Sequence, residues 1–518
     1  MKNRHISAIA VFVAASLTLA ACGGNGTDDG PDAPGDGGNG ESTGADTLNI
    51  GVHVEPTDWS PSRIQTILFP FTRQVYESLA SYDDELNPSP ELATEWEISD
   101  DQSAVTITLR DGVTFHSGEV FNAEAVAANL EFFANPETGQ QMFGPMSAVS
   151  DWEVLDDLTL QVNFTDPVAE LQITDLLQSW TIGDPGSLDD SSSGVGTGPF
   201  EFSEWVSGER IVLERNDDYW GEAPAYQTLN YRVFGDMDSL ISGFESGVID
   251  LAVDVPPLDA QRLEGQATVL TGNDGALIDQ WRINPSVAPF DDENVRMAIN
   301  YATDRQSIVD ALYHGYADPA TLPYGPHSPA YDAELAETLE FDLDRARQQL
   351  EDSGLSADEL SASIMVTSAN ARTEQAAQIL QASLGEIGFT LDIEVRDNAE
   401  YTEKMLAGDF QIVFSAIGNG QKYPTRITTN SIYRMEDNPV GATEIFPDYA
   451  PAVAAANSAV TEEEQAEAFA HLNEVLTEAM WVPTVGYLPT LWLTSDQVTG
   501  VDRDVDNMLL LAEAAPAN

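Results

Sequence analysis

The chain has 518 residues, with 21 lysines and arginines against 87 aspartates and glutamates, and a formal net charge of −66. So acidic a surface argues against nucleic acid and anionic lipid as partners, because both are polyanions. The only cysteine, Cys22, excludes an internal disulfide and a metal site built from several cysteines, and the length is enough for two or three domains.

Residues 1–21 have the pattern of a secretory signal peptide. Lys2 and Arg4 precede an apolar stretch over residues 6–20, and Leu-Ala-Ala comes directly before Cys22. The stretch is shorter than the ~20 residues that a membrane span needs. The pattern resembles a bacterial lipobox, which implies cleavage before Cys22, lipidation of this cysteine and anchoring to the cell membrane outside the cytoplasm. A plain signal peptide followed by an incidental cysteine is the alternative.

Residues 22–46 predict a flexible linker, because glycine and polar residues with few apolar side chains do not build a core. Removal of residues 1–21 leaves 19 basic against 87 acidic residues, a net charge of −68. Such a composition resembles proteins from salty habitats, and an ordinary acidic secreted protein is the alternative. We expect stability to depend on salt, which screens the repulsion between like charges.

Strands and helices alternate along the rest of the chain. Residues 48–54 predict a strand, and residues 105–109 alternate apolar and threonine side chains, as in a half-buried strand. Apolar residues recur at helical spacing over 295–302. Asp342 has the position of a helix N-cap, and Gly354 that of the C-terminal stop.

Residues 364–395 predict a βαβ unit. The apolar run 364–366 is followed by a helix through Leu380, Leu384 and Ile387, and then by the alternating strand 391–395. This order favours an α/β fold in which helices cover the sheets.

Four groups of short motifs follow one another along the chain. They are YESL at 76–79 with PELATEW at 90–96; LRDGVTFHSG at 109–118 with NAE at 122–124; GTGPF at 196–200 with LERNDDYW at 213–220; and PFDD at 289–292 with VRMAINYATDR at 295–305 and GYA at 315–317. In this order and spacing they resemble extracellular solute-binding family 5, the dipeptide-, oligopeptide- and nickel-binding components of ABC importers. The resemblance covers nearly the whole chain from about residue 47.

The resemblance implies an α/β, two-lobe periplasmic-binding-protein type II fold with an extra domain inserted in lobe one. Carried over to this chain, lobe one comprises residues 47–75, 200–285 and 490–518, the inserted domain 76–199 and lobe two 286–489. A small solute or peptide binds between the lobes, which close over it. Permease subunits of an ABC importer are the implied protein partners, and we expect a monomer without a cofactor.

Most residues of the motifs are interpreted as scaffold. Gly112, Gly118 and Gly198 supply turn geometry that bulkier residues resist. Arg110 and Asp111 are expected to brace a turn, and His116 is expected to do the same rather than to bind nickel or zinc.

The ligand site is predicted where this chain departs from the family pattern. Peptide-binding members carry a W-x-x-D-Y-P-D-P-like stretch whose first aspartate pairs with the α-ammonium of the peptide. The corresponding stretch here is IGNGQKYPTR at 417–426, in which a lysine replaces the acid. We therefore expect a carboxylate-bearing or otherwise anionic solute, such as an opine or a metal chelate. The predicted ligand-binding residues are Asn419, Lys422, Tyr423 and Arg426, with Trp281 and Arg282 across the hinge. A salt bridge from Lys422 to the acidic surface is the alternative.

No catalytic or metal-binding constellation emerges from the sequence. The histidines lack helical metal-ligand spacing. Asp502, Asp504, Asp506 and Glu513 match four positions of an EF-hand loop, but Asn507 replaces its glycine, so we expect no calcium site. We expect a binding protein rather than an enzyme. The alternative is an exported hydrolase that uses carboxylates or a serine.

Overall fold

The computed structural model describes residues 46–62, 70–83, 87–192, 194–272, 276–418, 423–428 and 442–517. The signal peptide, Cys22 and almost all of the linker lie outside these residues. Among the described residues, no helix is both long and apolar enough to cross a membrane.

A seven-stranded sheet contains the first folded strand. β1 (Thr47–Val52) pairs in parallel with β12 (Thr228–Val233) and β13 (Leu251–Ala252). The other members are β10 (Phe200–Val206), β11 (Arg210–Arg215), β14 (Thr268–Thr271) and β20 (Leu491–Thr494), in the order β10-β11-β12-β1-β13-β20-β14. A separate core beside α5 (Met237–Glu245) and α6 (Pro257–Leu263) includes Leu240, Leu263 and Leu493.

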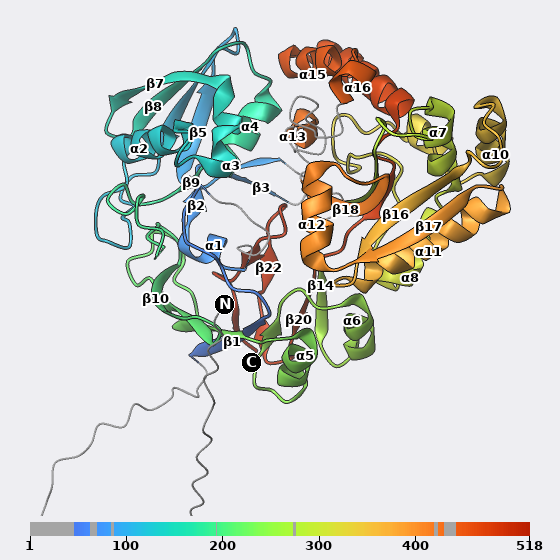
Figure 1. Cartoon of the computed structure of the whole chain (residues 1–518). Helices are drawn as coiled ribbons and strands as arrows, with labels where there is room; N and C mark the ends of the chain where they lie inside the picture. The colour runs from blue at the N-terminus through green and yellow to red at the C-terminus, as the bar shows by residue number, and fades with distance from the viewer. Residues whose placement is uncertain are drawn as a thin grey trace, which may run out of the picture. The chain divides into compact units, whose positions relative to one another are not determined.

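A four-stranded antiparallel sheet forms between β1 and β10 in the sequence. Its order is β5 (Ala93–Ile98), β6 (Ala104–Leu109), β8 (Thr159–Phe164) and β7 (Val149–Asp156). β6 buries every second residue, which confirms the alternation predicted over 105–109. Helices α2 (Ala123–Ala134) and α4 (Glu170–Ser179) lie beside this sheet (Figure 1). They contribute Leu130 and Leu177 to its core. Short pairs join β2 (Glu77–Ser78) to β9 (Thr181–Ile182) and β3 (Ala80–Tyr82) to β4 (Pro88–Pro90).

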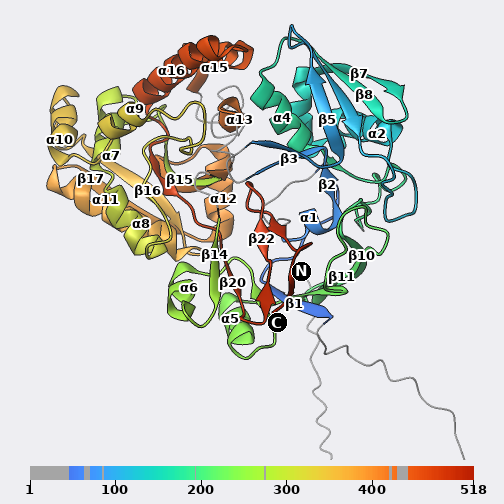
Figure 2. The ribbon, with the colours of Figure 1, turned by 180° about the vertical axis from the view of Figure 1, so that it is seen from behind.

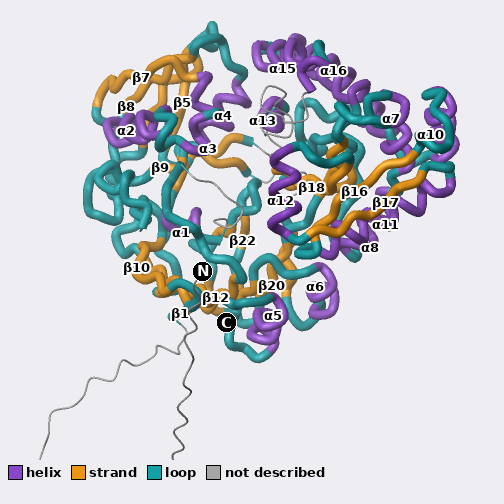
Figure 3. Tube along the Cα trace, viewed as in Figure 1, coloured by secondary structure: helices purple, strands orange, loops and turns teal. Residues whose placement is uncertain are grey.

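A five-stranded sheet forms the centre of a third domain, which follows those of the seven-stranded and four-stranded sheets. Its order is β17 (Thr390–Arg396), β16 (Ser361–Thr367), β18 (Ile412–Gly418), β15 (Leu277–Ile283) and β19 (Thr484–Tyr487). β16 and β17 run parallel and are joined by α11 (Ala371–Glu386), so the predicted βαβ unit is confirmed. The helices, purple in Figure 3, lie along this sheet, and Figure 2 shows α11 beside α8 (Arg305–Tyr313).

Two helices of the five-stranded domain, α7 (Glu293–Ala302) and α10 (Leu343–Asp352), agree with their sequence patterns. α7 buries Val295, Ala298, Ile299 and Ala302. The carboxylate of Asp342 caps α10 by accepting two backbone N–H groups, and Gly354 has a φ of +68° just beyond the helix. The remaining long helices are α12 (Asn398–Ala407), α15 (Tyr449–Ser458) and α16 (Glu462–Ala479).

The chain passes from the seven-stranded to the five-stranded sheet between β14 and β15, and returns between β19 and β20. The two connections lie side by side, because residues at their ends are hydrogen-bonded to one another. Gly272 N–H donates to Thr490 O at 2.8 Å, and Leu488 N–H donates to Leu277 O at 2.9 Å. The expected lobe boundary at residue 285 assigned β15 to lobe one. β15 instead pairs along its whole length with β18, so it lies in the five-stranded sheet.

Candidate functional site

The first and third motif groups meet at Glu77. This carboxylate, 4% exposed, accepts hydrogen bonds from Thr197 Oγ1, Tyr219 OH and Trp220 Nε1, each at 2.8 Å. Burial raises the pKa of Glu77, whereas the three donors lower it. All its described partners are side chains of the fold, which supports a scaffold role for these motifs.

A buried arginine beside Glu77 joins three distant segments. Arg73 is the second residue of α1 (Thr72–Val75). Its Nε donates to Asp504 at 2.9 Å. Its Nη1 lies 2.9 Å from Ser78 Oγ and 3.5 Å from Glu91 Oε2. Burial raises the pKa of Glu91 to about 8 although Arg73 opposes the shift. The EF-hand-like acid Asp504 therefore serves as an ion-pair partner within the fold.

Two of the three residues expected to brace turns, His116 and Arg110, connect segments distant in the chain, whereas Asp111 is exposed. His116 accepts the N–H of Gly196 at Nδ1 (3.3 Å), and its Nε2 donates to the carbonyl of Gly198 at 2.9 Å. Burial lowers the pKa of His116 to about 4, so the ring is neutral at pH 7. The Arg110 guanidinium lies 4.0 Å above the Trp220 ring and donates to Glu91 O.

The glycines of the motifs serve two different purposes. Gly112 and Gly118 have φ values of +79° and +85°, which confirms the expected turn geometry. Gly198 does not have a positive φ. A Cβ there would lie 2.6 Å from the carbonyl oxygen of Gln74, so close approach of two backbones is its physical reason.

Tyr423 is the predicted ligand residue whose surroundings are best described. Its side chain is fully buried in the core of the five-stranded region, and its hydroxyl donates to Ala456 O at 2.9 Å. Its backbone N–H donates to Asp175 Oδ2 at 2.7 Å. Asn419 and Lys422 lie outside the described residues, and Arg426 belongs to α13 (Thr425–Thr428) without a described side chain.

Trp281 and Arg282 lie on opposite faces of β15, because neighbouring residues of a strand alternate. Trp281 is fully buried, packs on Phe414 and donates from Nε1 to Thr303 Oγ1 at 3.0 Å. Arg282 lies 5.3 Å above the ring of Phe410, a member of the same core cluster as Tyr423. Burial lowers the pKa of Arg282. Arg282, but not Trp281, therefore lies on the face of the five-stranded sheet that packs against Tyr423. Arg282 is in the same sheet as β18 rather than across the hinge.

Asp175 was not singled out from the sequence. It is 3% exposed on α4 and accepts Tyr82 OH at 2.6 Å besides the N–H of Tyr423. It thus connects the domain of the four-stranded sheet to that of the five-stranded sheet. No local signal distinguishes it among 87 acids, because its partners are distant in the chain.

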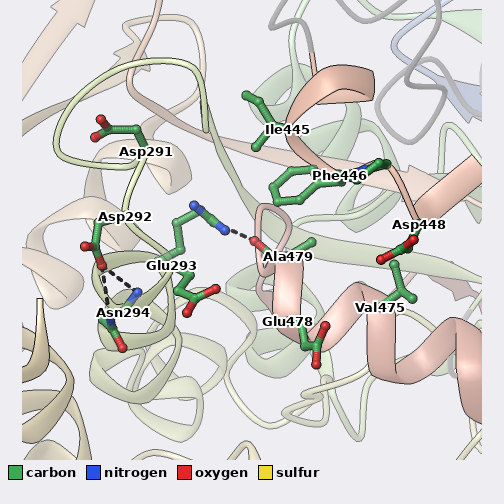
Figure 4. A pocket seen from close by; sticks show the side chains of 12 residues that line it. Asp291, Asp292, Glu293, Asn294, Ile445, Phe446, Asp448, Val475, Glu478 and Ala479 are labelled. Atoms are coloured by element: carbon green, nitrogen blue, oxygen red, sulfur yellow. Dashed lines mark hydrogen bonds between the residues drawn. The ribbon is translucent and has the colours of Figure 1, made fainter.

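A pocket of ≈ 450 Å³ lies within the five-stranded domain (Figure 4). The N-terminal end of α7, the segment 445–448 and the C-terminal end of α16 line it. Its walls combine Phe446 and Ile445 with acids that include Asp292 and Glu478, and the Arg296 guanidinium donates to Ala479 O beside it. Among the described residues, no three histidine, cysteine or acidic side chains are grouped to hold a metal ion.

The sequence matches the family of bacterial extracellular solute-binding proteins, family 5 Middle, over residues 87–433, more than half of the chain. The chain belongs to this family. Glutathione-binding protein GsiB of Pectobacterium atrosepticum is 25% identical over 351 residues, which cover 66% of this chain and 67% of that protein.

The solved structures of similar proteins show the same fold. NikA from Brucella suis, in complex with Fe(III)-EDTA, is 21% identical with a TM-score of 0.80, over 91% of this chain and 100% of NikA. AgaA from A. tumefaciens, in complex with agropinic acid, is 20% identical with a TM-score of 0.75, over 91% of this chain and 99% of AgaA. The expected type II periplasmic-binding-protein fold is therefore confirmed, and the chain is a family 5 solute-binding protein of an ABC importer.

Proposed function

We propose that this family 5 protein is anchored by a lipid on Cys22, captures a carboxylate-bearing solute between its two lobes and delivers it to the permease. The observation that carries the binding role is the family match over residues 87–433, together with two sheets connected only twice by adjacent segments of the described chain. Two such connections allow the lobes to rotate over a ligand. An exported hydrolase remains the alternative, and a turnover assay on peptides and glycosides distinguishes the two.

The ligand class is inferred from charge. Lys422 replaces the acid that pairs with a peptide ammonium in the peptide-binding members, and Arg426 follows it closely in a chain with 87 acids. The face that carries Tyr423 also carries Arg282, a residue that is 6% exposed. Charge-assisted bonds from such cations to a desolvated carboxylate contribute roughly 1.5–3 kcal/mol each. Glutathione and EDTA, named for GsiB and NikA, both carry more than one carboxylate, and glutathione also carries an α-ammonium group.

Identification of the natural ligand is the decisive experiment. We expect native mass spectrometry of protein purified from its own host to reveal a carboxylate-bearing compound. Titration calorimetry with glutathione, Fe(III)-EDTA and a dipeptide then ranks the classes, with an affinity in the micromolar range, about −8 kcal/mol. Recovery of a dipeptide with a free amino terminus as the natural ligand would contradict the anionic class.

Lys422→Asp tests the proposed role of the lysine. We expect at least a tenfold loss of affinity for the ligand and an almost unchanged melting temperature of the ligand-free protein. Lys404→Asp is the matched control, since Lys404 is the other lysine after residue 21 and pairs with Asp409 on the surface. Equal affinity of Lys422→Asp and the wild type would reject the role.

Cys22→Ser tests the anchor. We expect the variant to leave the membrane fraction, or to accumulate with its signal peptide, while ligand affinity stays the same. A second variant, Cys22→Ser with Thr43→Cys, restores a thiol within the linker but not at the lipobox. Membrane attachment of either variant after removal of its signal peptide would argue against lipidation of Cys22.

A further inference from the structure

One buried carboxylate on α4 connects two domains. Asp175 Oδ1 accepts the hydroxyl of Tyr82, from β3, at 2.6 Å, and Oδ2 accepts the backbone N–H of Tyr423 at 2.7 Å. Tyr82 and α4 precede residue 200, whereas Tyr423 follows β18 of the five-stranded sheet. Both contacts are short bonds to a carboxylate, a strong class of hydrogen bond.

The same face of α4 also reaches the C-terminal segment. Gln178, three residues after Asp175, donates to Asp506 Oδ2 at 2.7 Å. Asp506 is close to Asp504, which forms the ion pair with Arg73, and to Leu509, which is buried in the core of the seven-stranded sheet. Residues three apart on a helix lie on one side of it. One side of α4 therefore contacts both the five-stranded domain, at Tyr423, and the C-terminal segment beside the seven-stranded sheet, at Asp506.

Apolar packing accompanies these polar contacts. Ala169, the N-cap of α4, is fully buried in a core cluster that otherwise belongs to the five-stranded region and includes Tyr423. Leu171 packs against the same cluster. The contact of α4 with the five-stranded domain therefore has both an apolar and a charged component.

A contact away from the hinge limits rotation about it. The chain crosses between the two large sheets at only two places among the described residues, and these lie side by side at Gly272–Thr490 and Leu277–Leu488. The contacts of α4, which belongs to the domain of the four-stranded sheet, form a third connection. This connection restrains the rotation of the two large sheets relative to each other. Removing a contact that exists in one arrangement only shifts the population toward the other arrangement.

We propose that Asp175 is a positioning residue that holds the domain of the four-stranded sheet against Tyr423 and so favours the closed arrangement of the two lobes. Only the statement that this arrangement encloses a solute rests on the proposed function. The contact itself does not require a ligand. Asp175 acts through the backbone at Tyr423 and is not assigned to ligand contact.

Hydrogen exchange of the ligand-free full chain in detergent tests the proposal. The variants are Asp175→Ala, which removes both acceptors, and Asp175→Asn, whose amide retains one. Asp184→Ala is the matched control, because Asp184 is 5% exposed in the same region and its carboxylate accepts a local bond from Gly186 N–H at 2.8 Å, its side-chain partner among the described residues. Exchange is read by mass spectrometry in peptides that contain Tyr423, and small-angle scattering gives the radius of gyration.

We expect Asp175→Ala to accelerate exchange at Tyr423 at least about tenfold and to increase the radius of gyration. Asp175→Asn should give an intermediate acceleration, and Asp184→Ala none at this position. Peptides from β6 and β16, which lie inside separate cores, should exchange as in the wild type.

Three results would overturn the proposal: unchanged exchange at Tyr423 in Asp175→Ala, an equal effect of Asp184→Ala, or faster exchange spread evenly over β6 and β16. The last would indicate general destabilisation. Because no ligand is present, these results are independent of solute binding. A chain that shows the Asp175 effect but binds none of the tested solutes would reject the proposed function and leave the role of Asp175 intact.

Discussion

Gly198 occupies a position where two backbones are in contact. Its N–H donates to Val75 O at 3.0 Å, and a Cβ would lie 2.6 Å from Gln74 O. We expect Gly198→Ala to lower the free energy of unfolding by roughly 1–3 kcal/mol, because neither backbone can move away without losing hydrogen bonds. Urea denaturation measures the change. Gly144→Ala, where a Cβ meets no atom within 4 Å, is the control and should be nearly neutral.

Glu91 is predicted to make stability fall as pH rises. Burial raises its pKa to about 8 from an ordinary value of 4.5. Between these values the folded protein binds more protons than the unfolded chain, so the free energy of unfolding decreases with increasing pH and this stabilisation is lost as pH passes 8. Glu91→Gln removes the titration. Its melting temperature should therefore decline less between about pH 6 and pH 9 than that of the wild type.

Differential scanning fluorimetry across this pH range provides the measurement for Glu91→Gln. Glu95→Gln serves as the control, because Glu95 is exposed on the neighbouring strand β5. Parallel pH profiles for wild type and Glu91→Gln would show that Glu91 does not titrate in this range.

Local capping signals decide where the helices of the five-stranded domain begin. Asp342 Oδ1 accepts the N–H groups of Asp344 and Arg345, both at 2.9 Å. We expect Asp342→Ala to cost about 1 kcal/mol of unfolding free energy, the usual value for a lost N-cap. Chemical denaturation compares it with Glu351→Ala, an exposed change near the other end of α10. Equal stability of the two variants would contradict the cap.

Strand β15 shows what element-level prediction misses. Its residues predict a strand equally well in either lobe, since apolar side chains occupy both of its faces. Pairing with β18 over the register Leu277↔Gly418 to Ile283↔Ile412 places it in the five-stranded sheet. This choice depends on partners more than 100 residues away, which local periodicity does not encode. The domain boundaries remain a proposal, with this strand reassigned.

The excess of negative charge affects the stability of the whole molecule. Several exposed arginines of the described chain already lie beside acids, as Arg210 does beside Glu204 and Arg262 beside Glu245. The other acids repel one another, and salt shortens the range of this repulsion from ~10 Å at 0.1 M to ~3 Å at 1 M.

We therefore expect the melting temperature to rise from dilute to molar KCl. Calorimetry in KCl and in sucrose of equal osmolality separates charge screening from solute exclusion. A melting temperature that does not increase between dilute and molar KCl, or that increases equally in sucrose, would rule out charge repulsion as the limiting factor.

The sequence by itself determined the family, the α/β class, the βαβ unit at 364–395 and the caps and turns, because periodicity, capping and glycine act over a few residues. It also identified His116 and Arg110 as bracing residues. Only the tertiary structure decided that Trp281 faces the core while Arg282 faces the side of Tyr423, that Gly198 permits a backbone contact, and that Asp175 connects two domains. These features arise from contacts between distant segments, and their energies depend on burial and on partners that no short stretch of sequence specifies.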